Sequence, residues 1–238
     1  NPLAAGSQNR LVSLVAAFAR KGADVMAFIG TQIDDRPDLR VTNFGDYTRA
    51  HFGRRARNPG VDRAGGLELF LRGDVFPTHS RYEFLVLGAD AGALKGRLGR
   101  IIFRNREAGV EYCFIPGYAF SEPRDQTGEG PSASKNRLFW SQLGCWLQNL
   151  HRRCMVFLFL DVNGHLGWEN GGPQELLYPA GTSPVGTSFM EPTTWQGREC
   201  LRTLHAGHML AVNTVKGGAP THRNGHRLDP VSYTHLTL

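Results

Sequence analysis

The chain has 238 residues, 41% of them hydrophobic and 20% charged, which excludes a disordered protein and is ample for a buried core. Its formal net charge of +6 has the sign expected of a protein that handles polyanions. The longest apolar runs are far shorter than a membrane span, so we expect no membrane association.

The cysteines and the first residue bear on the cellular compartment. Cys113, Cys145, Cys154 and Cys200 form no CxxC pair and no dense framework. This usage favours a reducing environment, so we expect an intracellular protein, nuclear or cytoplasmic, that is not secreted. Because the sequence opens at Asn1 without an initiator Met or a signal-peptide pattern, we interpret it as a fragment.

The first half predicts one helix followed by strands. Leu11, Leu14, Val15 and Phe18 recur at helical spacing, and Gly22 follows as a stop signal. Turn residues bound the apolar segments that come next. These segments predict strands, several of them antiparallel neighbours, at residues 23–29, 66–72, 81–87, 97–103 and 111–115.

The second half predicts further helices and strands. Apolar residues from Phe139 to Leu150 mark a helix capped by Ser134 or Asn136. Loops rich in Gly, Pro and Ser are expected at 116–135 and 167–192. A strand at 155–160, a helix at 194–205 and a strand at 209–215 complete the order, which favours a layered sandwich of two sheets with helices outside.

The junction after residue 160 carries the clearest chemical signal. The apolar run 155–160 leads directly into Asp161-Val162-Asn163, and side chains two apart on a strand face the same way. A carboxylate can orient or deprotonate an attacking water, while an amide can hold a phosphoryl oxygen without adding negative charge. The pair suits phosphodiester chemistry, and the structural alternative is a strand that ends in an Asx turn.

Basic residues gather before the strand predicted at 66–72. We interpret Arg49, Arg54, Arg55, Arg57 and Arg63 as a basic loop that could contact phosphates. The alternative is an ordinary solvated loop.

The last residues resemble something other than a protein segment. Val231-Ser-Tyr-Thr-His-Leu-Thr-Leu238 resembles one reading frame of a sequencing-library adaptor, so we expect residues 230–238 to be a non-native tail after Asp229. The alternative is a genuine Thr-rich closing strand.

A series of short motifs stands along the chain: Asp24-Val-Met-Ala-Phe-Ile-Gly-Thr31, Gly65-Gly-Leu-Glu-Leu-Phe-Leu71, Phe114-Ile-Pro116, Asp161-Val-Asn-Gly-His-Leu-Gly167, Val212-Asn-Thr214 and Arg227-Leu-Asp229. Together they resemble the endonuclease/exonuclease/phosphatase superfamily, most of all the apurinic-type endonuclease domain of non-LTR retrotransposons. The resemblance covers residues 1–229. It implies one α+β domain, a deoxyribonuclease-like four-layer sandwich of two packed mixed β-sheets flanked by helices, which hydrolyses DNA with Mg²⁺ or Mn²⁺.

The resemblance also implies roles for single residues. Asp161 would activate the water, and Asn163 would position the scissile phosphate. Asp229 matches a carboxylate that orients a catalytic histidine. Asn1 falls about where the family has the asparagine of its first metal-side motif.

Residues near the end of the native sequence are expected to face DNA. Thr221, Asn224 and Arg227 lie on the strand-turn unit with which the family approaches DNA, and a simple hairpin turn is the alternative. The closing Ser-Asp-His of the family would lie further on. Ser232 and His235 lack the adjacent aspartate, so we reject them as its equivalents.

Two positions depart from the family pattern. Gly30 stands where the family has a metal-binding glutamate, and either Asp34 or Asp35 could substitute for it. Phe114 stands where the family has an active-site tyrosine, and Tyr112 is expected to be a structural side chain instead. We therefore expect a degenerate site.

The function that these motifs imply is a metal-dependent DNA endonuclease of a retrotransposon, associated with a reverse transcriptase and impaired in this copy. One alternative is a catalytically inactive remnant that binds DNA or protein. Another is a phospholipid-type phosphoesterase of the same superfamily. DNA is the expected partner, and no stable protein partner is evident.

Overall fold

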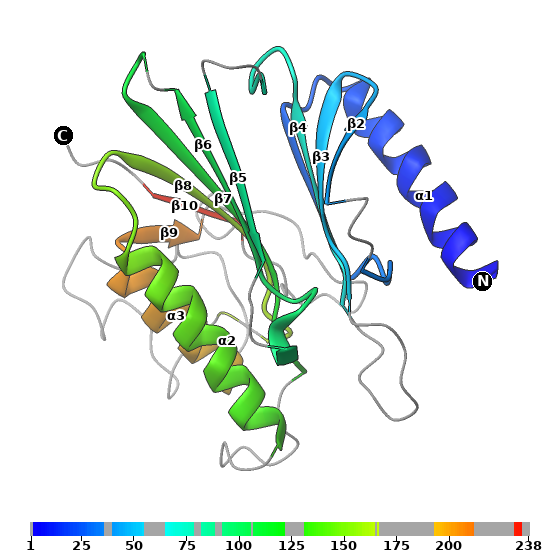
Figure 1. Ribbon diagram of the computed structural model, residues 1–238. Coiled ribbons are helices and arrows are strands. Elements are labelled where there is room, and N and C mark those ends of the chain that lie inside the picture. Colours follow the sequence, from blue (N-terminus) through cyan, green and yellow to red (C-terminus); the bar gives the residue numbers. More distant parts are fainter. Residues whose placement is uncertain are drawn as a thin grey trace. The chain divides into compact units, whose positions relative to one another are not determined.

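The computed structural model describes residues 2–35, 40–54, 65–78, 82–88, 92–105, 107–121, 131–164, 166, 193–211 and 231–234 (Figure 1). The chain divides into two compact units, residues 1–118 and 119–238, and we describe each by itself. Within the described ranges, no helix is long and apolar enough to cross a membrane.

The first unit begins with a helix and continues mainly as strands. Its elements are α1 (Pro2–Ala19), β1 (Val25–Ile29), β2 (Val41–Phe44), β3 (Tyr47–Phe52), β4 (Leu67–Arg72), β5 (Tyr82–Gly88), a 3-10 turn (Gly92–Leu94), β6 (Gly99–Asn105) and β7 (Val110–Tyr118). The predicted helix and the predicted strands of this half are confirmed. Strand β7 runs past its expected end at residue 115. In β1, Met26 is buried and the other four residues are half-buried.

Strand β4 is central to the first sheet, whose order is β1-β4-β3-β2 with antiparallel registered pairs. Leu67, Leu69 and Leu71 have no exposed surface. Phe70, which points to the other face, belongs to a core cluster with Val15 of α1. Both faces of β4 are therefore buried, which explains its nearly continuous apolar sequence.

Strands β5, β6 and β7 form an antiparallel meander, and β1 and β4 pack against β7. The ring of Phe76 makes edge contacts with Phe103, Tyr112 and Phe114 at centroid distances of 5.5, 5.9 and 5.2 Å. Such aromatic edges fill core space efficiently. The expected α+β class, with two packed sheets and flanking helices, is confirmed.

The hairpin β2–β3 was not predicted. Arg49, placed by the sequence in a basic loop, lies in β3, where every side chain is buried. Arg54 is also buried, and its Nε donates to Asp34 Oδ1 at 2.7 Å. The interpretation of these two arginines as solvated or phosphate-contacting loop residues is wrong. The other arginines of that run lie outside the described residues.

A buried ionic cluster joins β3 to β4. Arg49 Nε donates to Glu68 Oε2 at 2.8 Å, and His51 Nδ1 lies 2.6 Å from Glu68 Oε1. His51 Nε2 lies 3.2 Å from the backbone carbonyl of Asp34. The side chains of His51 and Glu68 have no exposed surface. A carboxylate can occupy a buried strand because these partners compensate its desolvation.

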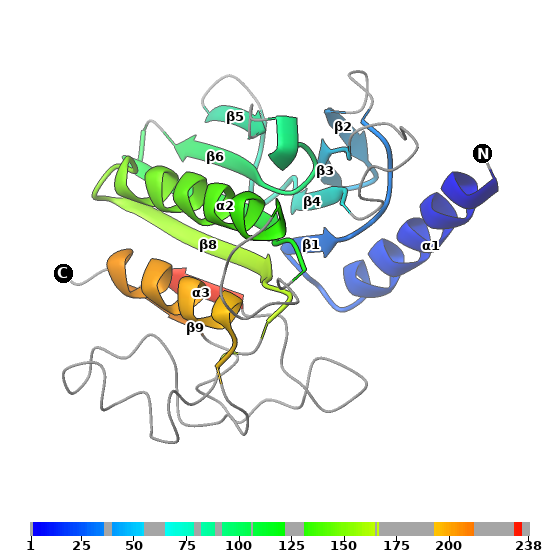
Figure 2. The ribbon, with the colours of Figure 1, turned by 90° about the horizontal axis from the view of Figure 1, so that it is seen from below.

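The second unit contains α2 (Pro131–Gln148), β8 (Cys154–Asp161), α3 (Trp195–Ala206), β9 (Met209–Ala211) and β10 (Val231–Thr234). Helices α2 and α3 lie side by side (Figures 1 and 2). The strand predicted at 155–160 and both helices are confirmed. Along β8, buried residues alternate with half-buried ones, so one face of the strand carries the core.

The helix ends differ in how well they were predicted. Thr194, where the sequence predicted the helix to begin, is the N-cap of α3, since its side chain accepts from the Gly197 N–H at 3.2 Å. Asn136 was a candidate cap for α2, but that helix begins at Pro131. Asn136 instead lies inside the helix with no exposed surface.

Strand β10 comes from the segment expected to be a tail. It pairs antiparallel with β8 on one side, Ser232 opposite Leu158, and with β9 on the other, Ser232 opposite Ala211. Main-chain pairing depends little on side-chain identity. The strand therefore follows from the available edges of β8 and β9, whatever the origin of the segment.

We predict that Glu68→Leu lowers the free energy of unfolding by about 3–5 kcal/mol, because it leaves the buried Arg49 and His51 without their carboxylate. Urea denaturation measures the loss. The control is Glu199→Gln, which breaks an ion pair with the exposed Arg202 and should cost less than about 1 kcal/mol. Equal losses in the two variants would show that the buried cluster does not stabilise the fold.

Candidate functional site

Strand β8 ends at Asp161, and the chain turns there. Asn163 has a φ of 48°, and its backbone N–H donates to Asp161 Oδ1 at 3.0 Å. The strand therefore ends in the Asx turn that was the structural alternative, and Asn163 lies beyond the strand rather than two positions along it. Both residues are half-buried, which leaves their side chains access to solvent.

The side chain of Asn163 is held as well. Its Nδ2 donates to the backbone carbonyl of Ala119 at 2.8 Å, and the Ala119 N–H donates to the carbonyl of Asp161 at 2.9 Å. An amide NH₂ has two N–H donors, and the second makes no hydrogen bond to a described residue. The turn thus orients a donor that can reach an anion, so the Asx turn and a phosphate-holding role are compatible.

In the first unit, Gly30 follows the end of β1. Its φ of 72° lies in the left-handed region that favours glycine. A Cβ at this position would meet the ring of Tyr118, with Cε1 at 3.6 Å. The same ring lies 4.5 Å from the guanidinium carbon of the buried Arg97. Glycine supplies no ligand atom, so this position has no carboxylate to offer a metal.

Both candidate substitutes for the missing glutamate are already paired with cations. Asp34 Oδ1 accepts from Arg54 Nε, and Asp35 Oδ2 lies 2.5 Å from Lys95 Nζ. These ion pairs give both aspartates a structural role, and their substitution for the missing glutamate stays an expectation.

Phe114 lies in the core, with 1% of its surface exposed. Its ring packs against Phe76 and stacks on Tyr112 at a centroid distance of 6.4 Å, as expected for a structural Tyr112. The burial of the ring gives Phe114 a packing role, and its correspondence to the family's active-site tyrosine stays a prediction of the resemblance. The phenol at the end of β7 belongs to Tyr118, which the sequence placed in a loop starting at Pro116.

Several predicted site residues lie outside the described part of the chain. They are Asn1, Thr221, Asn224, Arg227 and Asp229. Gly30 belongs to the first unit, whereas Asp161 and Asn163 belong to the second. The sequence predicts that Gly30, Asp161 and Asn163 cluster at one rim where strand ends meet, and this stays a prediction.

The described residues do not fit a magnesium site. Among them, no group of three His, Cys, Asp or Glu side chains comes close enough to hold a metal ion. A hard cation needs several oxygen ligands in fixed geometry, and Gly30 provides none. We therefore derive no reaction step through a metal.

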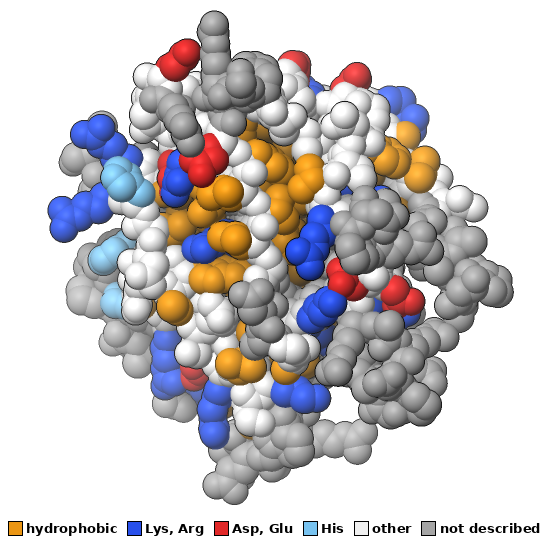
Figure 3. All heavy atoms as spheres, in the orientation of Figure 1, with side chains coloured by type: hydrophobic (Ala, Val, Ile, Leu, Met, Phe, Trp, Pro, Cys, Tyr) orange, Lys and Arg blue, Asp and Glu red, His pale blue; other side chains and the backbone are white. Residues whose placement is uncertain are grey.

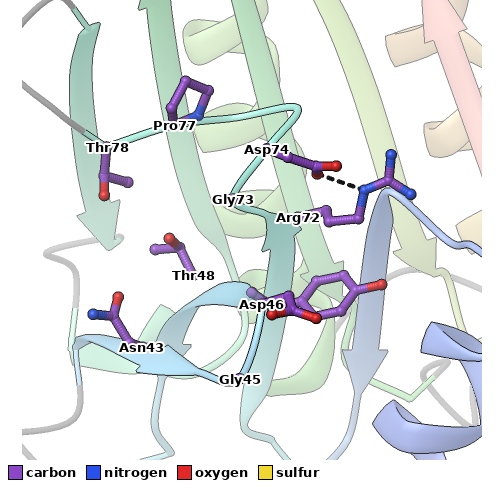
Figure 4. A pocket seen from close by; sticks show the side chains of 10 residues that line it. Asn43, Gly45, Asp46, Thr48, Arg72, Gly73, Asp74, Pro77 and Thr78 are labelled. Carbon is purple, nitrogen blue, oxygen red and sulfur yellow. Dashed lines mark hydrogen bonds and ion pairs between the residues drawn. The ribbon is translucent and has the colours of Figure 1, made fainter.

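One hollow of about 730 Å³ lies beside the turn of the β2–β3 hairpin (Figure 4). Arg72 Nε donates to Asp74 Oδ1 at 2.6 Å, and its Nη1 pairs with Asp24 at 2.9 Å. The hydrogen bond that Arg72 donates to Asp74 raises the pKa of the guanidinium. None of the predicted site residues that the structure describes lines this hollow, and Arg72 is paired with two carboxylates.

Cys200 of α3, in the second unit, is another titratable group whose pKa is shifted. Its thiol is fully buried, and burial raises its pKa well above the ordinary range. The thiol therefore stays protonated and is no nucleophile.

No family model and no curated protein matches the sequence. Solved structures do match its fold. The AP endonuclease LMAP from Leishmania major is similar with a TM-score of 0.60 and 11% identity, over 96% of this chain and 75% of the other. A 3′ phosphatase from Neisseria bound to product DNA hairpin gives 0.56 and 13%, over 94% and 81%. The human Nocturnin catalytic domain gives 0.53 and 13%, over 95% and 74%.

These structures belong to one superfamily, and the likeness extends over nearly the whole chain. The similarity includes the layered order of sheets and helices. The chain therefore shares the fold of these structures, at 11–13% sequence identity.

Proposed function

We propose that residues 1–229 are the DNA endonuclease domain of a non-LTR retrotransposon, associated with a reverse transcriptase, and that catalysis is impaired in this copy. One observation carries the proposal: the Asp161–Asn163 turn is intact, and Ala119 orients the Asn163 amide. Two structures of similar fold, an AP endonuclease and a 3′ phosphatase bound to a DNA hairpin, support DNA as the substrate. Residues 230–238 stay outside the proposed domain.

In this proposal the two side chains divide the work. Asp161 orients the attacking water and accepts its proton, while the Asn163 Nδ2–H that does not face Ala119 donates to a non-bridging phosphoryl oxygen. The hydrogen bond from the Asn163 N–H to Oδ1 fixes the plane of the Asp161 carboxylate. A preorganised acceptor and donor of this kind need no reorganisation when charge develops.

The proposed roles of residues beyond this turn rest on the family resemblance. Asp229 would orient a histidine, Asn1 would belong to the metal side, and Thr221, Asn224 and Arg227 would contact DNA. Mg²⁺ or Mn²⁺ is the cofactor of such an enzyme, and we propose that this copy binds it weakly.

A second candidate function is an inactive remnant that binds DNA. Gly30 favours it, because its left-handed backbone suits glycine and disfavours any side chain that could supply a ligand. The two candidates differ in whether a carboxylate at this position restores cleavage.

We predict that the unchanged chain nicks supercoiled plasmid in magnesium about 100- to 1000-fold more slowly than Gly30→Glu, the usual scale for one electrostatic contact in a site. The matched control is Gly30→Gln, which has the same size and the same backbone strain without the charge. Adding Asp161→Ala to Gly30→Glu should abolish nicking.

Each other outcome has a definite meaning. Nicking by the unchanged chain that equals that of Gly30→Glu and is lost in Asp161→Ala would show that the missing carboxylate is not the cause of impairment. No nicking by any variant would show that a carboxylate at position 30 is not sufficient to restore cleavage in this chain.

We also predict weak binding of duplex DNA that falls steeply as salt rises, because counterion release supplies most of such affinity. Lys and Arg side chains are visible at several places on the face shown in Figure 3, and little sequence preference is expected because contacts to phosphates carry no sequence information. Fluorescence anisotropy at two salt concentrations measures both. Affinity that is insensitive to salt, or binding confined to phosphoinositide or sphingomyelin vesicles, would favour the phospholipid-type alternative.

A further inference from the structure

Residues 119–121 of the second unit are held by side chains. The Phe120 N–H donates to Asn136 Oδ1 at 3.0 Å, and the Phe120 carbonyl accepts from Gln196 Nε2 at 2.6 Å. Asn136 Nδ2 donates to the Ser121 carbonyl at 3.3 Å. One side chain of α2 and one of α3 therefore fix the segment whose first residue, Ala119, orients Asn163.

Gln196 has no freedom in this arrangement. It has no exposed surface, and its Oε1 accepts from the Trp140 Nε1–H at 2.8 Å. An indole N–H can only donate and a backbone carbonyl can only accept, so only one orientation of the Gln196 amide satisfies both partners. The residue thus ties α3 to α2 and to Phe120 at once.

The first turn of α3 also lies close to Gly164, the residue that follows Asn163. A Cβ added to the buried Gly164 would lie 2.6 Å from Gln196 Cβ and 2.6 Å from Thr194 Oγ1. The residue after Asn163 must therefore be small, and it can hardly move while α3 stays in place. Gln196 therefore constrains the turn in two ways. Its Nε2 donates to the Phe120 carbonyl, and its Cβ lies close to Gly164.

We propose that Gln196 is a positioning residue for the Asp161–Asn163 turn. It holds the Phe120 carbonyl and packs near Gly164, and so keeps the Ala119 carbonyl where Asn163 Nδ2 donates to it. The effect of this positioning on catalysis rests on the proposed function. The positioning itself is a property of the folded second unit and can be measured without DNA.

The test is an NMR measurement of hydrogen exchange at the Asn163 side-chain amide, assigned by its loss in Asn163→Asp. Gln196→Met removes both hydrogen bonds at nearly constant volume and should speed this exchange about fivefold to tenfold, the scale of one lost hydrogen bond. Gln196→Glu should act in the same direction, because a carboxylate oxygen would face the Phe120 carbonyl. Leu204→Ala, a buried α3 control outside the network, should lower Tm and leave the exchange unchanged.

Unchanged Asn163 exchange in a folded Gln196→Met protein would overturn the proposal, as would an equal change in Leu204→Ala. If Gln196→Met does not fold, Gln196→Glu decides in the same way, since it keeps an acceptor for Trp140. A faster Asn163 exchange together with no plasmid nicking by any variant, Gly30→Glu included, would support Gln196 as the positioning residue and count only against the proposed endonuclease.

Discussion

Buried backbone groups need hydrogen-bond partners, and in residues 119–121 only the Ala119 N–H is seen to pair with the neighbouring strand β8, while the other bonded backbone groups pair with side chains. Asn136, Gln196 and Asn163 each supply one or more of these partners. This requirement links α2, α3 and the end of β8 to a single short segment. The candidate catalytic turn is therefore built on helices that are distant from it in sequence, and its geometry depends on their packing.

A related constraint governs the first unit, where β4 is buried on both faces. Its buried carboxylate, Glu68, is paired with Arg49 and His51 from β3. The same pairing explains why the hairpin β2–β3 was missed. Its polar residues suggested a solvated loop, because a sequence does not reveal which charges will be paired inside a fold. The two-residue turn Gly45-Asp46 between Phe44 and Tyr47 was the local signal for it.

The periodicity of apolar residues was sufficient to predict the helices and the apolar strands, because burial of one face or of both faces gives a regular pattern in the sequence. The end of β8 was located for the same reason, and with it Asp161 and Asn163. Strand length was not readable to the same accuracy. Three further residues in β7 move the end of the strand from Ile115 to Tyr118 and leave Phe114 in the core. Gln196 gave no signal, because its partners are backbone and indole groups remote in sequence.

Strand β10 lies between β8 and β9 and pairs with both. It therefore covers the main-chain edges of both strands. The residues that do so resemble a sequencing adaptor, which is a reason to remove them from an expressed protein. A preparation that stops at Asp229 would expose both edges, and unpaired edges are templates for pairing with another chain. Solubility and oligomeric state could then report on the missing strand rather than on the domain itself.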